Sequence, residues 1–525
     1  MTTPWWRGAA IYQIYIRSFF DSDGDGHGDL AGVLARLDYI ASLGVDALWL
    51  SPVHPSPNRD WGYDVADYEG VHPDYGSLAD LGALVEAAHA RGIKVLLDEV
   101  LSHTSDEHPW FAASRDGGAD GPFADWYVWA DPAEDGTAPN NWLSVFGGPA
   151  WAYQPARRQH YHHKFLRQQP KLNWRNPAAR EAALKVLDFW LARGIDGFRL
   201  DVAGTFLHDA ALTDNPPVPP AMRGRREWAH ASEMQRHLFD SNLEENVEML
   251  DLIRRRVEAF EDRFVFGEFS EEEARCGGYL GPGAGLHSGY NFNFLTARKL
   301  EPGFVKRHYQ MLAGYPDHWT CVSFSNHDVP RTVTRFGRGG ADPAVARLMF
   351  ALLLALPGNP LIYMGEELGL PDGEVTRAQL RDPVGDLYWP IAKGRDPCRT
   401  PMPWSAGEAL GFTTGTPWLP AQPAHAPLTV EAQDADPGST LNFARAALAA
   451  RKACAPLRLG EIAFLDAPEP VLAFERTWQG ERVLCAFNMG EAAVAVPFAA
   501  TGETLIAAGE GELGPYGVLV RRAGR

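Results

Sequence analysis

Residues 78–98 read LADLGALVEAAHARGIKVLLD, and this stretch decides the fold. Its first part, 78–91, carries Leu, Val and Ala at helical spacing, and Gly92 follows as a residue that commonly ends a helix. The next apolar run, Val95-Leu96-Leu97, is short and ends in Asp98, which is typical of a buried strand. The stretch therefore predicts a helix that leads directly into a strand, the repeating unit of a parallel sheet.

The same alternation recurs on both sides of this stretch. Before it, the sequence predicts strands at 10–15 and 47–51 with a helix at 30–43 between them. After it, predicted strands and helices continue to alternate, with strands at 197–201, 264–268, 321–325 and 360–363 and helices at 177–193, 247–260, 343–356 and 441–453. Regular alternation of this kind favours an α/β protein built as a (β/α)8 TIM barrel.

Two regions interrupt the alternation. Residues 104–172 are rich in aromatic residues, Gly, Pro and Asp and lack a helical period, which indicates an irregular insertion after the third strand. Residues 456–525 contain short apolar runs at 471–474, 483–487 and 494–496 separated by turn residues, which predicts a C-terminal all-β domain, a β-sandwich. The barrel itself is accordingly assigned to 1–103 and 173–455.

The composition excludes several classes of partner. The formal net charge is −19, and nucleic acids and anionic membranes attract positive rather than negative surfaces. No apolar run reaches the ~20 residues of a membrane helix, and the N-terminus lacks the basic and apolar regions of a signal peptide. The five cysteines are scattered and form no CxxC pair, which favours a reducing, cytoplasmic location without disulfides or a zinc site.

Acidic residues end apolar runs at four places in the barrel region. They are Asp98, Asp201, Glu268 and Asp328. A single acid after a strand is most often a helix cap, but capping does not explain the neighbouring His103 and His327. Because the carboxyl ends of barrel strands meet at one mouth, where active sites lie, we expect these side chains to converge.

Arg199 and Asp201 are two residues apart in a predicted strand, so their side chains point to the same face. A surface ion pair is the alternative, but it does not fit inside an apolar run. A neighbouring guanidinium favours an ionised carboxylate, which suits a nucleophile. Retaining glycosidases use one carboxylate as nucleophile and another, about 5–5.5 Å away, as general acid/base. Asp201 and Glu268 are the candidate pair.

The chain resembles glycoside hydrolase family 13, the α-amylase family, over nearly its whole length. The most similar members are the bacterial α-glucosidases and oligo-1,6-glucosidases. Four motifs carry the resemblance: Asp98-Glu99-Val100-Leu101-Ser102-His103, Gly197-Phe198-Arg199-Leu200-Asp201, Phe266-Gly267-Glu268 and Ser325-Asn326-His327-Asp328.

The resemblance implies roles for these residues. Asp201 would be the nucleophile, Glu268 the general acid/base and Asp328 the third acid. The glucose pocket would also be lined by Arg199, His103 and His327. The implied activity is that of a retaining α-glucosidase, which releases glucose from short α-glucosides through a covalent glucosyl-enzyme intermediate and needs no organic cofactor.

Two further segments resemble the family's pocket. In Asp60-Trp61-Gly62-Tyr63-Asp64, the resemblance implies that Asp60 binds the far end of the glucose and that Tyr63 stacks on its ring. In the segment 395–404, RDPCRTPMPW, it implies that Arg399 pairs with Asp60. Such a clamp closes the pocket floor, so that one glucose at a time would be removed from the non-reducing end.

The resemblance also fails at two positions. The insertion, which corresponds to the family's domain B, ends in Gln169-Pro170-Lys171-Leu172-Asn173, and Lys171 stands where the family usually has Asp. Ser102 stands where the family usually has Asn before the histidine. The Asn helps to hold calcium between domains in many amylases, so that calcium site is not predicted in this chain.

A different metal site is predicted in the first loop. The sequence of 21–29, DSDGDGHGD, begins like an EF-hand loop but has Gly32 where the bidentate Glu would stand. Hard oxygen ligands suit a structural Ca²⁺, or Mg²⁺ if water completes the shell. The predicted ligands are Asp21, Asp23, Asp25, His27 and Asp29. A solvated acidic turn is the alternative. The histidines at 160, 162 and 163 suggest zinc, but alternate positions of a strand explain them better.

The sequence leaves the substrate open between several oligosaccharides. The long Pro-rich loop 203–245 favours short α-1,4 substrates, whereas Val202, directly after the nucleophile, tends to accompany α-1,6 activity in this subgroup. A transglycosylase, such as a sucrose isomerase or a trehalose synthase, would use the same three acids. A non-catalytic relative is disfavoured because all three acids are present. The oligomeric state is not predicted.

Overall fold

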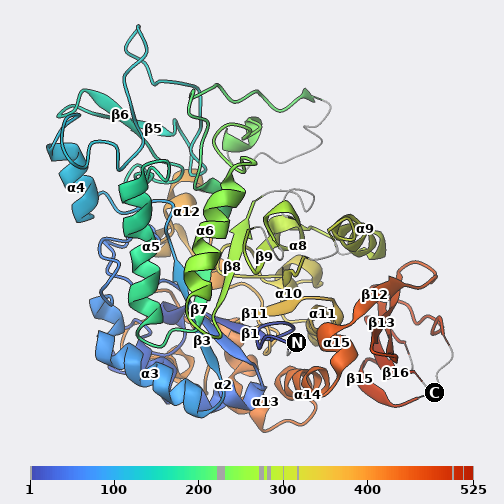
Figure 1. Ribbon diagram of the computed structural model, residues 1–525. Helices are drawn as coiled ribbons and strands as arrows, with labels where there is room; N and C mark the ends of the chain where they lie inside the picture. The colour runs from blue at the N-terminus through green and yellow to red at the C-terminus, as the bar shows by residue number, and fades with distance from the viewer. Residues whose placement is uncertain are drawn as a thin grey trace.

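The computed structural model describes residues 3–220, 231–270, 277–280, 285–299, 301–315, 318–498, 502–511 and 513–523. Its centre is an eight-stranded parallel sheet in the order β10-β11-β1-β2-β3-β7-β8-β9, which confirms the predicted barrel (Figure 1). The strands are β1 Ile11–Ile14, β2 Ala47–Leu50, β3 Lys94–Glu99, β7 Gly197–Leu200, β8 Phe264–Phe269, β9 Ser288–Asn291, β10 Cys321–Ser323 and β11 Asn359–Tyr363.

Side chains join the two outer strands of this sheet. The hydroxyl of Ser288 in β9 donates to the carbonyl of Trp319 (2.8 Å), which precedes β10. The hydroxyl of Thr320 donates back to the carbonyl of Gly289 (3.2 Å). Sequence patterns missed β9, because its residues, SGYN, include no apolar run and only one β-former.

The inward-facing residues of the strands form a buried layer below the mouth of the barrel. Its members come from many strands and include Ile11, Trp49, Leu96, Phe264, Phe266, Tyr290 and Leu361. Strand side chains alternate, so Asp98 continues the inward row of Leu96, and Glu268 continues that of Phe266. Asp98 and Glu268 therefore lie at the mouth of the barrel, above an apolar interior.

Helices surround the sheet on its outer side (Figure 1). The predicted helix at 30–43 is two helices that meet at Arg36, and a capping box of Ser77 and Asp80 begins the helix that precedes β3. The α-helices of the barrel region are α1 Leu30–Ala35, α2 Leu37–Leu43, α3 Leu78–Ala90, α5 Pro177–Leu191, α6 Asn246–Glu258, α8 Phe292–Thr296, α9 Pro302–Leu312, α10 Thr332–Phe336, α11 Pro343–Ala355, α12 Pro383–Tyr388, α13 Val430–Asp434 and α14 Thr440–Lys452. None of the described helices is long and apolar enough to cross a membrane.

The chain between β3 and α5 forms a separate small sheet, at the upper left of Figure 1. It contains α4 Pro109–Asp116 and three antiparallel strands, β4 Trp129–Ala130, β5 Trp151–Gln154 and β6 Gln159–His162, in the order β4-β6-β5. The predicted strand positions of His160 and His162 lie in β6. Backbone pairing of His103 with Lys171 joins the start of this region to its end, and Tyr127 pairs with Leu172 beside them.

The C-terminal region is an antiparallel sheet in the order β12-β13-β14-β16-β15. Its elements are α15 Ala455–Leu459, β12 Glu461–Phe464, β13 Val471–Trp478, β14 Glu481–Asn488, β15 Thr504–Ala508 and β16 Val518–Arg522. The runs 471–474 and 483–487 are strands as predicted, but 494–496 is not. Val494 and Val496 instead pack loosely against Val471 and Leu513, so the described residues form one sheet rather than a sandwich.

Candidate functional site

Arg199, on β7, lies at the centre of a buried cluster at the barrel mouth and is 0% exposed. Its Nη1 contacts Asp98 Oδ1 on β3 at 2.6 Å and Asp201 Oδ1 at 2.8 Å. Its Nη2 contacts Glu268 Oε1 on β8 at 2.6 Å. The strands β3, β7 and β8 are adjacent and parallel, and Asp98 lies directly beside Arg199 in the register. One guanidinium thus gathers three of the four predicted acids.

Burial opposes ionisation of the carboxyl groups in this cluster. Burial raises the pKa of Asp201 well above its ordinary value, and Arg199 favours the ionised form as expected but does not outweigh the burial. Burial likewise raises the pKa of Asp98 to about 6, against the effect of Arg199. Three carboxylates around one cation resist full ionisation, so the cluster can supply both an acid and a carboxylate nucleophile.

Two other contacts fix Glu268. The hydroxyl of Tyr290, on β9, donates to Glu268 Oε1 at 2.9 Å and accepts from Arg199 Nη2 at 3.1 Å. The backbone amide of Val202 donates to Glu268 Oε2 at 3.2 Å. Tyr290 was not identified from the sequence, because it lies on the strand whose pattern gave no signal.

Asp328 has the opposite electrostatic environment. Its Oδ1 accepts from Arg399 Nη2 at 2.9 Å and from Arg395 Nη1 at 3.3 Å. Burial raises the pKa of Asp328, but His327 and these two arginines together hold the pKa below its ordinary value. Asp328 therefore stays ionised, which suits a group that stabilises positive charge.

The predicted pairing of Asp60 with Arg399 is wrong. Asp60 Oδ1 instead accepts from Arg395 Nη2 at 2.6 Å, and Arg395 also binds Asp382 at 2.7 Å. Arg399 is fully buried, and its Nε donates to the carbonyl of His327 at 2.7 Å. The short helix Asp396–Arg399 turns between the two arginines and directs Arg399 inward under Asp328. The clamp at the pocket floor is thus Asp60–Arg395–Asp328.

The remaining predicted pocket residues lie against one another. The ring of Tyr63 stacks on that of His327, with centroids 5.2 Å apart and planes 5° apart, and its hydroxyl donates to Asp98 Oδ2 at 2.9 Å. The ring of His103 contacts the carbonyl of Tyr63 through Nε2 at 2.9 Å. Burial lowers the pKa of His103 and of His327 to about 3, so both are neutral hydrogen-bonding groups. Gln169, which the sequence did not single out, donates to Asp60 at 3.0 Å.

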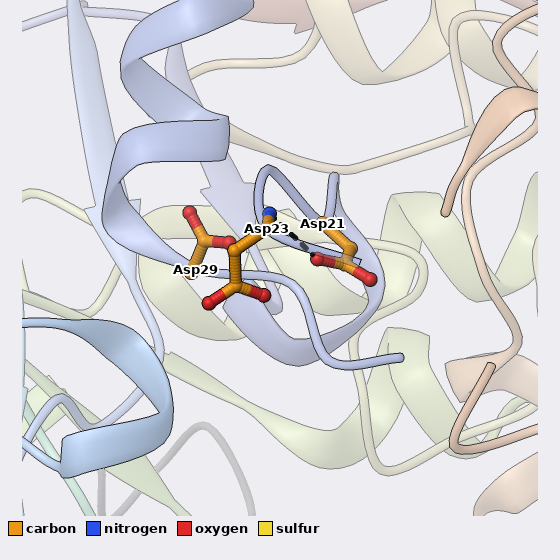
Figure 2. Close-up of side chains that lie close together, drawn as sticks. All are labelled: Asp21, Asp23 and Asp29. Carbon is orange, nitrogen blue, oxygen red and sulfur yellow. Dashed lines mark hydrogen bonds between the residues drawn. The ribbon is translucent and has the colours of Figure 1, made fainter. Parts of the chain in front are cut away.

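The acidic loop after β1 brings together three of its five predicted ligands. One carboxylate oxygen each of Asp21, Asp23 and Asp29 lies within 4.8 Å of the others (Figure 2). Asp25 accepts from the amide of His27 at 2.7 Å, and His27 Nδ1 lies 2.7 Å from Arg17 Nη1. The imidazole therefore faces a guanidinium, away from the carboxylate group. The three clustered oxygens fit a hard divalent cation.

Comparison with known proteins agrees with this geometry. Residues 13–460 match the family model of the alpha amylase catalytic domain. A probable alpha-glucosidase of Rhizobium meliloti (strain 1021) is 46% identical over 498 residues, which cover 93% of this chain and 90% of that protein. An oligo-1,6-glucosidase of Parageobacillus thermoglucosidasius is 34% identical over 537 residues, covering 94% and 91%.

A solved structure is similar over the whole chain. The crystal structure of the alpha-glucosyl transfer enzyme XgtA matches with a TM-score of 0.94 and 45% identity, covering 100% of both chains. Family match, relatives and fold agree with the cluster of acids at the strand ends. The chain therefore belongs to the α-amylase family, glycoside hydrolase family 13, and is a glycoside hydrolase of its α-glucosidase and oligo-1,6-glucosidase subgroup.

Proposed function

We propose that the enzyme is an exo-acting, retaining α-glucosidase of short α-glucosides. The observation that carries the proposal is the pair of contacts from Arg199 to Asp201 and to Glu268, at 2.8 and 2.6 Å, which holds both groups on one guanidinium. Asp201 attacks the anomeric carbon while Glu268 gives a proton to the leaving oxygen, and Glu268 then activates the water that releases glucose. The ionised Asp328 stabilises the positive charge that develops on the sugar ring.

The clamp at the pocket floor supports exo-action. Asp60, Arg395 and Asp328 are joined by contacts of 2.6 and 3.3 Å, and Gln169 closes the other side of Asp60. A polysaccharide that continued past the bound glucose would have to break these contacts and leave buried charges without partners, which is costly. The pocket is thus suited to a single non-reducing terminal glucose.

The long loop after the nucleophile supports short substrates. It is bound to the inserted region: Asn141 Nδ2 donates to the carbonyl of Asn215 at 3.0 Å, and Trp142 Nε1 donates to that of Thr213 at 2.8 Å. Gln235, further along the loop, donates to the carbonyl of Asn141 at 2.7 Å. Residues 221–230 of the predicted loop lie outside the described residues. We infer that these attachments hold the loop over the leaving-group side of the pocket.

We expect kcat/KM to fall as the substrate lengthens, because under this proposal the attached loop narrows the leaving-group side. Maltose should be cleaved at least about tenfold more efficiently than a maltodextrin, a difference of about 1.4 kcal/mol in transition-state binding. Initial rates of glucose release from both substrates provide the measurement. Equal efficiency on both substrates would contradict the role given to the loop. Gln235→Ala removes one attachment of the loop and should reduce the ratio of kcat/KM for maltose to that for maltodextrin.

Transfer of glucose to a sugar acceptor is the second candidate function. The likeness to XgtA, an alpha-glucosyl transfer enzyme, favours it. Transfer and hydrolysis share the step at Asp201 and differ only in whether a sugar or a water accepts the glucosyl group. Product analysis at high maltose and high sucrose separates them. Glucose alone from maltose, and glucose with equimolar fructose from sucrose, indicate hydrolysis, whereas trisaccharides or isomerised disaccharides indicate transfer or isomerisation.

We also propose that the group of Asp21, Asp23 and Asp29 holds a structural Ca²⁺, or Mg²⁺ with added waters. A cation bound only by the folded state stabilises it by about 2.7 kcal/mol at 100 times its Kd. Adding CaCl₂ after EDTA treatment should therefore raise Tm, and Asp23→Asn should remove this response.

Asp23 is exposed, so its replacement should otherwise change the free energy of unfolding little. The matched control is Asp120→Asn, at another exposed site, which should keep the response. An unchanged Tm with and without Ca²⁺ in the parent enzyme would contradict the site.

A further inference from the structure

Lys171 is buried where the inserted region returns to the barrel. Its side chain is 1% exposed, and its ammonium donates a hydrogen bond to the backbone carbonyl of Thr205. Among the described residues no carboxylate lies within ion-pair distance of Lys171. The nearby Asp240 forms its ion pair with Lys164, at 2.7 Å. The titratable groups around it are Lys164, Asp240, His103, His162 and His208. A buried cation whose hydrogen bond goes to a carbonyl needs an explanation other than charge neutralisation.

The carbonyl that Lys171 binds belongs to the turn that follows the nucleophile. Thr205 ends the 3₁₀ helix Ala203–Thr205. Its amide and hydroxyl both donate to the carbonyl of Val202, at 2.9 and 2.8 Å. The amide of Val202, which directly follows Asp201, donates to Glu268 at 3.2 Å. Four hydrogen bonds thus connect the ammonium of Lys171, through Thr205 and Val202, to the general acid/base.

The turn is strained at its first residue. Val202 has φ 41° and ψ 47°, in the left-handed region. A β-branched residue in this region is a genuine outlier, and such strain costs about 1–3 kcal/mol and persists only where the surroundings enforce it. Contacts that hold the turn are therefore needed to keep the amide of Val202 directed at Glu268.

We propose that Lys171 is a positioning residue for the catalytic pair. By holding the carbonyl of Thr205 it fixes the turn 202–205, and through that turn it sets where Glu268 stands relative to Asp201. The inference rests on the proposed function, because it assumes that these two carboxylates carry out the reaction. It also gives a use to the lysine at a position where the resemblance led us to expect Asp.

Stability does not account for a lysine at this position. Burial, with a smaller effect of Lys164, lowers the pKa of Lys171 to about 7. An unfolded lysine titrates near 10.4, so between these values the unfolded chain binds more protons, and stability rises with pH across this window. At and below neutral pH the buried charge therefore weakens the fold, and an apolar side chain of similar length removes that penalty.

The test is Lys171→Met. We expect kcat to fall about 10- to 100-fold, the cost of a displaced catalytic group, while KM for maltose changes little because the glucose pocket is intact. Tm should stay the same or rise. Wild-type kcat, or a loss of kcat that follows a loss of Tm, would overturn the proposal.

The double mutant of Lys171→Met and Thr205→Val tests whether Lys171 acts through the turn 202–205. Thr205→Val removes the hydroxyl contact to Val202, and it should lower kcat through the same turn. If Lys171 acts through this turn, the double mutant loses less than the product of the two single losses. Independent, multiplying losses would place the action of Lys171 elsewhere and would overturn the path.

Arg476→Met is the matched control. Arg476 is also a fully buried cation that donates to backbone carbonyls, those of Ala355 and Gly460, but in the C-terminal sheet. Its replacement should leave kcat unchanged in the folded enzyme, in contrast to the loss of kcat expected for Lys171→Met. An active Asp201→Asn enzyme would refute the proposed function, whereas normal kcat in Lys171→Met with an inactive Asp201→Asn would refute only this inference.

Discussion

Asp201→Asn is expected to lower kcat for maltose by at least about 10⁴-fold, because it removes the nucleophile and leaves only binding and electrostatic stabilisation. The fold should survive. Because burial raises the pKa of Asp201, the native state binds more protons than the unfolded chain between the ordinary and the raised pKa, and stability falls as pH rises across that window. Asn carries no charge and has no such effect. Initial rates and a thermal melt of the same sample are the measurements. We expect Tm to be unchanged or higher.

The corresponding control is Asp382→Asn, a buried carboxylate that contacts the pocket residue Arg395 at 2.7 Å. Its kcat should stay within about tenfold of the parent. A loss of activity in Asp201→Asn that came with a large fall in Tm would show unfolding rather than loss of the nucleophile. A fully active Asp201→Asn enzyme would exclude Asp201 from the chemistry.

Glu268→Gln should have an effect that depends on the leaving group. On maltose, whose leaving alcohol needs a proton, we expect a loss of about 10²- to 10⁴-fold, the usual contribution of a general acid. On 2,4-dinitrophenyl α-glucoside the leaving group departs without protonation, so the first step should be nearly normal and a burst of dinitrophenol should precede slow turnover. Absorbance in a stopped-flow instrument measures the burst.

Asp328→Asn gives the comparison for this prediction. Asp328 stabilises the ring charge in the transition state of every substrate, so its replacement should slow both substrates to a similar degree. An equal loss on both substrates in Glu268→Gln would show that Glu268 is not the proton donor. A burst of dinitrophenol in Asp328→Asn would instead assign the role of proton donor to Asp328.

Local patterns were sufficient to predict most of the barrel and the acids that meet at its mouth. An apolar run that ends in an acid is a short-range signal, and Asp98, Asp201 and Glu268 each follow such a run. Alternation along a strand then fixes the face, and parallel strands bring their ends together. No long-range contact had to be known for this step, which is why the three acids were found.

The parts that the sequence did not reveal depend on tertiary contacts. Arg395 and Arg399 have the same chemistry, and only the turn of the helix Asp396–Arg399 decides which of them reaches Asp60. Tyr290 lies on a strand of small and polar residues, and this strand is stabilised by its neighbours rather than by β-propensity. The run 494–496 has the pattern of a strand but no partner strand among the described residues.

The most direct measurement of the central claim is to trap the covalent intermediate. A 5-fluoro-α-glucosyl fluoride forms the glucosyl-enzyme and slows its hydrolysis, so that intact mass followed by peptide mapping identifies the esterified residue. The proposed mechanism predicts one added fluoroglucosyl group, carried by Asp201 in the segment Gly197-Phe198-Arg199-Leu200-Asp201, with no label in Asp201→Asn. Label on another residue, or inactivation without any label, would contradict it.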